Sequence, residues 1–428
     1  MNPSLSLMSW NWQKSDWPNF VWDGGLLEKT EQQFLLGGGV LVGTVKHLPE
    51  EDRERLTVEA MSTEAVTTSE IEGEILDRAS VQSSIRKQLG LISDGRRIRP
   101  AEHGIAEMMV DLYRSVSDPL SKETLFRWHE MIVSGRRDLK DVGRFRTGTE
   151  PMQDVSGRID ELRLHFEAPP SSRVASETKR FLEWFARTSK DGKQPLPALT
   201  RAAVSHLYFE SIHPFEDGNG RIGRAIAEKS LAESLGRPTL IMLATTILLR
   251  QEAYYQALEA ANQQNEITSW IVWFAGITIE AQRRTIALVE FLIEKTKLFD
   301  RLQNELNQRQ TKALLRMFRE GPEGFKGGLN AGNYASITGA SPATTTRDLS
   351  DLVSKGALTR EGELRHARYS LNIPVRRVGE INVKRTGRDC RKMTAKPPPP
   401  TIVASTLSYR FQQSMPPCAS IIRASRSS

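Results

Sequence analysis

The sequence predicts a mainly α-helical protein: a helical-bundle core that carries a short β-hairpin, followed by a smaller C-terminal domain. Apolar residues recur at helical spacing through most of the chain, and convincing strand patterns are confined to two short stretches. The pattern then ends after residue 374 in a basic, proline-containing tail. At 428 residues the chain is long enough for two or three domains.

The composition is that of an ordinary globular protein, with 39% hydrophobic and 26% charged residues. The most apolar stretch, Leu240 to Leu249, is about half as long as a bilayer span. The N-terminus, MNPSLSLMSWNW, lacks the basic region and apolar stretch of a secretory signal. We therefore expect a cytoplasmic protein that makes no contact with a membrane.

The net charge of +7 arises from the C-terminal tail of the chain. Residues 375–428 hold eleven basic and two acidic residues, so the remainder of the chain is close to neutral, and the overall charge gives no reason to expect that the core binds nucleic acid. The only cysteines, Cys390 and Cys418, also lie in the tail and lack the spacing of metal ligands. We expect neither a disulfide nor structural zinc.

Residues 1–48 predict a small N-terminal module that caps the core. A glycine run occupies residues 37–39, and the module contains four of the eight tryptophans, Trp10, Trp12, Trp17 and Trp22. Tryptophans contribute most of their surface to burial, so we interpret these as packing anchors rather than a ligand cage.

Residues 49–298 predict the helical core. Apolar positions from Leu56 to Ile71 indicate a helix that ends near Glu72, because Gly73 interrupts the pattern. Further helical periodicity covers residues 100–135, 175–190, 198–212, 220–235, 250–262 and 266–298. The stretch from Arg146 to Phe166 is the exception, since its glycines and proline favour a β-hairpin or an exposed flap.

Residues 299–374 predict a separate C-terminal domain. One helix is expected at Arg309–Phe318, a second before Gly339 and a third at Ser341–Ser354, followed by a hairpin that turns at Glu361–Gly362. Helix, turn, helix and hairpin in this order are typical of a winged helix. Residues 375–428 are expected to be disordered.

The run HPFEDGNGRIGR at residues 213–224 contains the main candidate functional residues. Pro214 disfavours helical dihedral angles at His213, so the preceding helix should stop there and leave the imidazole on a loop. A glycine-rich turn then leads into the N-terminus of the next helix, whose free N–H groups and dipole suit a polyphosphate. Arg221 and Arg224 share one helix face and can reach further phosphate oxygens, while Asp217 offers a hard oxygen ligand for Mg²⁺.

This run resembles the signature of the Fic family, HxFx(D/E)GNGRxxR, at all eight fixed positions and all intervals. The resemblance implies a protein adenylyltransferase, in which His213 deprotonates a Ser, Thr or Tyr hydroxyl of a target protein for attack on the α-phosphorus of ATP. Asp217 would hold Mg²⁺ or Mn²⁺, and Phe215 would anchor the loop in the core. The remaining phosphate-binding residues implied are Gly218, Asn219, Gly220, Arg221 and Arg224.

The resemblance extends over residues 1–372, and the N-terminal module and winged helix accompany this catalytic domain in some bacterial members. Gly143 to Arg146, with the segment at Val155 and Ser156, resembles the start of the family's flap, which aligns a target segment by strand addition. Tyr254, Tyr255 and Asn262 resemble positions that line the adenosine pocket. Helix packing is an equally good interpretation of the two tyrosines.

Residues 68–73 fit the family's inhibitory motif, (S/T)xxxE(G/N), with Thr68, Glu72 and Gly73 at the fixed positions of a helix spanning about 57–73. The resemblance implies that Glu72 forms a salt bridge with Arg224 and denies that arginine to the γ-phosphate of bound ATP. By itself, a glutamate in an acidic helix is usually a solvated side chain. Whether the protein also removes AMP, with Glu72 positioning a water, stays open.

Two other functions remain alternatives at this point. One is transfer of phosphate or phosphocholine on the same fold. The other is a DNA-binding regulator in which the winged helix acts and the Fic core senses. Within residues 341–356, Arg347 and Lys355 are offset by Asp348 and Asp351, which is weak electrostatics for reading DNA. Protein docking or assembly of a homodimer suits this helix at least as well, and the tail is best interpreted as an extension without a role.

Overall fold

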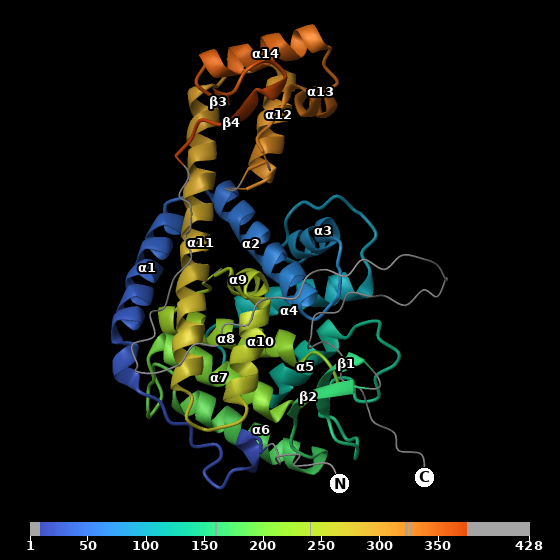
Figure 1. Cartoon of the computed structure of the whole chain (residues 1–428), viewed down its shortest axis with the longest axis vertical. Helices are drawn as coiled ribbons and strands as arrows, with labels where there is room; N and C mark the ends of the chain where they lie inside the picture. Colours follow the sequence, from blue (N-terminus) through green and yellow to red (C-terminus); the bar gives the residue numbers. More distant parts are fainter. Residues whose placement is uncertain (1–8, 159–160, 240, 322–323, 326, 375–428) are drawn as a thin grey trace.

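The computed structural model describes residues 9–374, apart from 159–160, 240, 322–323 and 326. Within these residues the protein is mainly helical, with fourteen α-helices and two small antiparallel sheets (Figure 1). The predicted mainly α fold is therefore confirmed. The predicted disordered tail at 375–428 lies outside the described residues. None of the described helices combines the length and the apolar character needed to cross a bilayer.

The N-terminal segment packs closely on the core. Short 3₁₀ turns at Asn11–Gln13 (η1) and Gly24–Leu26 (η2) precede a helix, α1 (Glu28–Lys46), which runs along α11 (Thr268–Arg301) (Figure 1). The sequence did not predict α1, because its glycine run has low helix propensity. Packing explains the run: a Cβ at Gly37 would lie 2.2 Å from Oε1 of Gln282, and one at Gly38 would lie 2.9 Å from Leu235.

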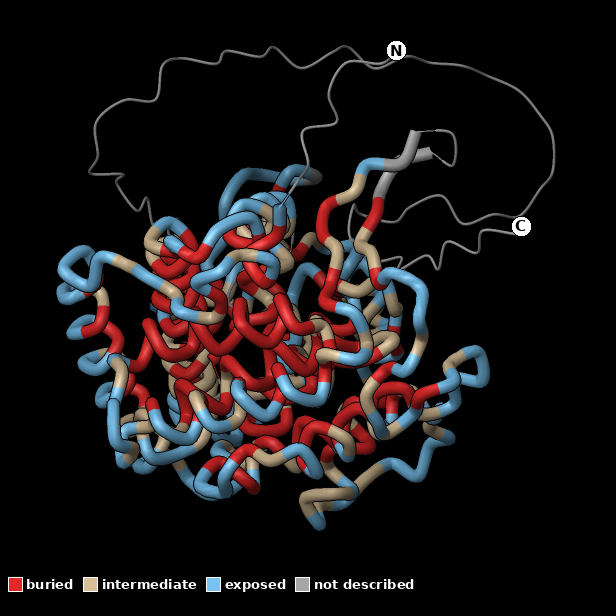
Figure 2. The backbone as a smooth tube through the Cα atoms, turned by 90° about the horizontal axis from the view of Figure 1, so that it is seen from below, coloured by how far each residue is buried: buried red, intermediate tan, exposed pale blue. Residues whose placement is uncertain are grey.

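The central region is a helical bundle built around α7 (Ala198–Ile212), whose fifteen residues are all buried. Figure 2 shows this buried interior at the centre of the molecule. The helix beside it, α8 (Asn219–Leu235), makes its most extensive packing with α7. The surrounding helices are α2 (Glu50–Ile71), α3 (Arg78–Gln88), α4 (Pro100–Arg114), α5 (Lys122–Ile132), α6 (Ser171–Arg187), α9 (Leu243–Leu249) and α10 (Gln251–Ala261).

Most predicted helical segments agree with these bounds within a few residues. The region 100–135 holds two helices, because the chain turns after Ser115 and a new helix starts where the Ser121 side chain caps Thr124. The short helix α9 had appeared in the sequence only as an apolar stretch. The hairpin at the flap pairs β1 (Gln153–Arg158) with β2 (Glu161–Glu167), and a bulge lies between Asp154 and Val155.

The C-terminal unit lies at the far end of α11 (Figure 1). It contains α12 (Gln308–Arg319), α13 (Ala331–Thr338), α14 (Pro342–Ser354), β3 (Leu358–Glu361) and β4 (Arg368–Leu371), with the two strands antiparallel. These elements share a hydrophobic core with the last turns of α11. The order matches the expected one, and the winged-helix assignment stays a prediction. Asp348 of α14 accepts hydrogen bonds from Arg309 and Tyr334, so this carboxylate has a packing role within the unit.

Candidate active site

The sequence run at 213–224 forms a sharp loop between α7 and α8. The helix α7 stops at Ile212 because His213 adopts a left-handed conformation, with φ of 50° and ψ of 62°. Gly218, with φ of 83°, then turns the chain into α8. The side chain of Asn219 fixes the loop between them, since it accepts from the backbone N–H of Phe215 at 3.0 Å and donates to its carbonyl at 2.9 Å. The loop therefore brings the imidazole to the N-terminus of α8.

Phe215 anchors this loop from inside the bundle, as the resemblance implied. Its ring is fully buried and stacks on His129, with the ring centroids 4.2 Å apart. Nδ1 of His129 accepts a hydrogen bond from the backbone of Gly143, which ties the loop to the start of the flap. Burial lowers the pKa of His129 to about 4, so the ring is neutral and serves packing.

Arg146 holds the His213 loop from the flap side. Its Nε donates to the carbonyl of His213 at 2.8 Å, its backbone N–H to that of Pro214, and Nη2 to that of Pro169. Burial lowers the pKa of this guanidinium to about 10. The sequence had placed Arg146 only at the start of the flap. Its function as an anchor of the catalytic loop depends on contacts between residues more than twenty positions apart.

We expect Arg146→Lys to loosen the loop. A lysine cannot reach the carbonyls of His213 and Pro169 together, so one buried acceptor loses its partner. The free energy of unfolding should fall by about 3 kcal/mol, as measured by chemical denaturation. Arg144→Lys is the matched control, because Arg144 lies on the same segment and is exposed. An Arg146→Lys protein as stable as the control would contradict this role.

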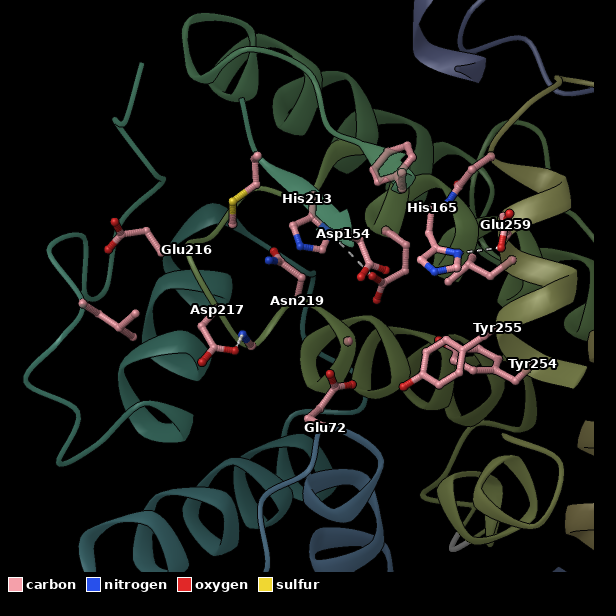
Figure 3. Close-up of a pocket in the computed structure, with 18 of the residues that line it drawn as sticks. Glu72, Asp154, His165, His213, Glu216, Asp217, Asn219, Tyr254, Tyr255 and Glu259 are labelled. Atoms are coloured by element: carbon pink, nitrogen blue, oxygen red, sulfur yellow. Dashed lines mark hydrogen bonds and ion pairs between the residues drawn. The ribbon is translucent and has the colours of Figure 1, made fainter. Parts of the chain in front are cut away.

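A cavity of about 490 Å³ opens beside the loop (Figure 3). The flap forms one wall with side chains that include Asp154 and His165, and α10 forms another. His165 and Arg163 of the flap both pair with Glu259 of α10, at 2.8 Å each, so the flap is fastened to this wall. His213, Asp217, Gly218, Asn219 and Gly220 all face the same cavity. The structure thus brings the loop residues predicted from the sequence together around one space.

His213 is equipped to accept a proton. Burial lowers the pKa of its imidazole to about 4, the positive charge of Arg146 adds to this effect, and a hydrogen bond to the backbone of Glu210 opposes it. The ring is therefore neutral at pH 7. A neutral imidazole that faces a cavity next to a helix N-terminus has the arrangement of a general base beside an anion site.

Asp217 lies at the edge of the cavity on the turn into α8. Burial alone would raise the pKa of this carboxyl, but the charges of Arg221 and Arg136, with hydrogen bonds from Arg136 and the backbone of Gly218, lower it overall. A single ionised carboxylate beside an anion-binding turn fits Mg²⁺, which is commonly held by one or two carboxylates and the phosphates of the substrate. No cluster of three or more metal-binding side chains occurs in the described part of the chain.

Arg224 is engaged by the end of α2. It donates from Nη2 to the Glu72 carboxylate at 2.7 Å and to the Thr68 carbonyl at 2.9 Å, and from Nε to the Thr68 hydroxyl at 2.7 Å. Burial alone would lower the pKa of Arg224, but Glu72 raises it. Gly220 permits this approach, because a Cβ there would lie 2.2 Å from the Glu72 carboxylate. Gly73, with φ of 78°, ends the helix just after Glu72.

Arg221 pairs with a carboxylate that lies just after α2. Its Nη1 donates to the Glu74 carboxylate at 2.7 Å and to the carbonyl of Ile132 at 3.4 Å, and the side chain is buried. Glu74 was not among the predicted site residues. Arg224 therefore pairs with Glu72 at the end of α2, and Arg221 pairs with Glu74 just after it.

The residues expected to line the adenosine pocket both pack against neighbouring side chains and line the cavity. Tyr254 is buried and shares a hydrogen bond with His206 at 2.9 Å, while the Tyr255 hydroxyl donates to the carbonyl of Ile71 at 3.2 Å. Both rings, and Asn262, also line the cavity. Val155 is buried in the flap, and Ser156 pairs with Arg163 through the backbone ladder.

Glu210 is a buried carboxyl that sequence reasoning missed. It lines the cavity, and its Oε2 lies 3.9 Å from Nδ1 of His213. Burial, reinforced by the negative charge of Glu72, raises its pKa to about 8, so the carboxyl is protonated at neutral pH. Its place one turn before His213 on the buried helix α7 was the available signal.

We expect this carboxyl to make the protein less stable as the pH rises. Because the pKa is about 8 in the folded state and near 4.5 in the unfolded chain, the folded state binds more protons between these values. Its contribution to stability is complete below pH 4.5 and is lost as the pH rises to about 8. The slope should be on the order of 1 kcal/mol per pH unit, measured by urea unfolding across this range. Glu210→Gln should flatten the profile and the exposed Glu183→Gln should not; equal profiles would refute the assignment.

The site brings a neutral histidine, an ionised aspartate and a helix N-terminus together around one cavity. Residues 119–231 match the family described as Fic/DOC family, and residues 10–91 match the Domain of unknown function (DUF4172). Residues 119–231 therefore form a Fic domain.

Among curated proteins, the chain is 24% identical over 201 residues to the protein adenylyltransferase fic-1 of Caenorhabditis elegans, covering 46% of this chain and 35% of the relative. It is 28% identical over 98 residues to a probable protein adenylyltransferase of Aquifex aeolicus, covering 23% of this chain and 27% of the relative. The chain thus spans about a third of the length of these relatives.

Solved structures with detectable similarity include a Fic family protein from Desulfovibrio desulfuricans G20, at 21% identity and a TM-score of 0.46 over 81% of this chain and 97% of that chain. Fic-1 (residues 134–508) from C. elegans aligns at 20% identity and a TM-score of 0.44, over 64% of this chain and 75% of that chain.

Proposed function

We propose that the protein is an adenylyltransferase that moves AMP from ATP to a hydroxyl side chain of a protein substrate. The observation that carries the proposal is the His213 loop, which puts a neutral imidazole beside the N-terminus of α8 in a cavity of about 490 Å³. The names of the two curated relatives support the same transfer.

In the proposed reaction the hydroxyl proton of the target passes to Nε2 or Nδ1 of His213 while the hydroxyl oxygen attacks the α-phosphorus. The new O–P bond forms as the bond from the α-phosphorus to the bridging oxygen breaks, and pyrophosphate leaves with that electron pair. N–H groups at the start of α8 stabilise the charge that builds on the phosphate oxygens. Mg²⁺ or Mn²⁺ held by Asp217 would neutralise the polyphosphate.

Glu72 supports a second element of the proposal, an internal brake. While Glu72 and Thr68 hold Arg224, its Nε and Nη2 donors are occupied and are not available to a γ-phosphate. ATP would then bind in a pose unsuited to in-line attack. Because Glu72 also lines the cavity, we further propose that it positions a water for hydrolysis of AMP from the modified target.

The target would reach the site along the flap. Strand addition to the hairpin of β1 and β2 supplies sequence-tolerant backbone pairing and holds the hydroxyl near His213. We also propose that the protein forms a homodimer and is located in the cytoplasm.

The position of the transferred phosphorus tests the function. Glu72→Gly protein is incubated with ATP labelled at either the α- or the γ-phosphorus, and label is measured on the protein. We expect label from the α position alone. Retention of the γ label would establish phosphate transfer instead and overturn the proposal.

A further inference from the structure

Asp217 is already paired with cations of its own chain. Nη2 of Arg221 lies 3.6 Å from its Oδ1, and Arg136 makes the closer contact. Nη1 of Arg136 donates to Oδ2 of Asp217 at 2.6 Å, and the other carboxylate oxygen accepts from the backbone N–H of Gly218. Figure 3 shows Asp217 on the turn into α8, with this second contact drawn. Both oxygens of the carboxylate assigned to the metal are thus engaged within the protein.

A second carboxylate fixes the orientation of Arg136. The residue lies in the turn after α5, next to Gly135 with φ of 87°. Its Nε and Nη2 donate to the two carboxylate oxygens of Asp138, at 2.8 and 2.6 Å. This paired contact leaves Nη1 as the end directed at Asp217. Arg136 and Asp138 both line the cavity, and the arginine side chain is 42% exposed, so a ligand can reach it.

A metal ion at Asp217 conflicts with this arrangement. Mg²⁺ binds carboxylate oxygen at about 2.1 Å, whereas the guanidinium nitrogen lies 2.6 Å from the same carboxylate. A dication and a guanidinium so close together repel each other strongly unless an anion lies between them. The polyphosphate of a nucleotide is such an anion, and arginine binds phosphate oxygens through the same N–H groups.

We propose that Arg136 is a placeholder cation: it neutralises Asp217 in the nucleotide-free protein and passes to the phosphate chain of a metal-bound nucleoside triphosphate when the metal takes Asp217. The second half of this exchange rests on the proposed function. The exchange makes binding of the metal and the nucleotide interdependent, because the metal alone must displace Arg136 without a phosphate to receive it.

The first experiment measures Mn²⁺ alone, by electron paramagnetic resonance of the free ion, in the nucleotide-free protein. Arg136→Gln should raise the affinity for Mn²⁺ by about tenfold or more, since one adjacent positive charge is removed. Arg137→Gln is the matched control, because Arg137 is exposed on the same turn and does not line the cavity. Asp217→Asn should abolish the site in either background. Equal affinities for wild type and Arg136→Gln would overturn the placeholder role.

The second experiment measures α,β-methylene ATP with Mg²⁺ by calorimetry, in the Glu72→Gly background. Arg136→Gln should weaken this binding by about tenfold, while affinity for adenosine stays unchanged. We therefore expect Arg136→Gln to raise the affinity for Mn²⁺ alone and to lower the affinity for the nucleotide with Mg²⁺. Unchanged nucleotide affinity would overturn the transfer of Arg136 to phosphate. The Mn²⁺ result depends on no catalytic activity, so failure of AMP transfer in the label assay would leave it standing.

Discussion

Glu72→Gly should raise self-modification by labelled ATP on the order of 10–100-fold. The substitution removes the carboxylate that accepts from Arg224 at 2.7 Å, which releases the guanidinium for the γ-phosphate. Because Arg224 is buried, the loss of its carboxylate partner should also lower the free energy of unfolding. The measurement is the initial rate of label incorporation from ATP labelled at the α-phosphorus.

Glu70→Gly is the control for this result. Glu70 lies two residues earlier on α2 and is exposed, so its loss changes the charge and helix propensity of the same turn without touching Arg224. Glu72→Gln separates charge from contact, since an amide oxygen can still accept from Arg224 but binds it less tightly; an intermediate rate is expected. If Glu72→Gly and Glu70→Gly both leave the rate at the wild-type level, the proposal that Glu72 inhibits the transfer is wrong.

His213→Ala, placed in the Glu72→Gly protein, should lower the rate of transfer by roughly 10²–10⁴-fold, the range lost when a general base is removed. Nucleotide binding should persist, because the N-terminus of α8 and Asn219 remain. The matched control is His103→Ala, a histidine exposed on α4. A loss of affinity for α,β-methylene ATP as large as the loss in rate would assign His213 to binding rather than to proton transfer.

The pKa of His213 adds a pH dependence to that prediction. A base with a pKa of about 4 is deprotonated, and so active, throughout the neutral range, and it becomes protonated only as the pH falls toward that value. The acid limb of kcat/KM should therefore lie near pH 4 rather than near the ordinary value of 6.5. A limb at the ordinary value would show that the ring is more solvated during catalysis than in this structure.

Local sequence signals predicted the loop at the centre of the site. Pro214 disfavours helical dihedral angles at the residue before it, and Gly218 and Gly236 adopt positive φ at the two ends of α8, so α7 and α8 were placed within one residue of their bounds. By contrast, α1 escaped detection because its glycine run has low helix propensity, and the close packing of Gly37 on Gln282 and of Gly38 on Leu235 joins residues far apart in the sequence.

The site could be predicted only in part from the sequence, because several of its contacts join residues that are far apart along the chain. Glu72 and Arg224 are 152 positions apart, and only the resemblance to an inhibitory motif connected them before the structure did. The pairs Glu74–Arg221 and Arg136–Asp217 belong to no motif, and each joins residues that the bundle brings together by packing. Both pairs engage residues of the signature run.

The most direct test of the account is the mass of a modified side chain. Glu72→Gly protein is incubated with ATP and Mg²⁺, digested and analysed by tandem mass spectrometry, with the His213→Ala double variant as the blank. We expect a gain of one adenylate on a Ser, Thr or Tyr hydroxyl, absent from the blank. A gain of phosphate alone, or an adenylate that persists without His213, would contradict it.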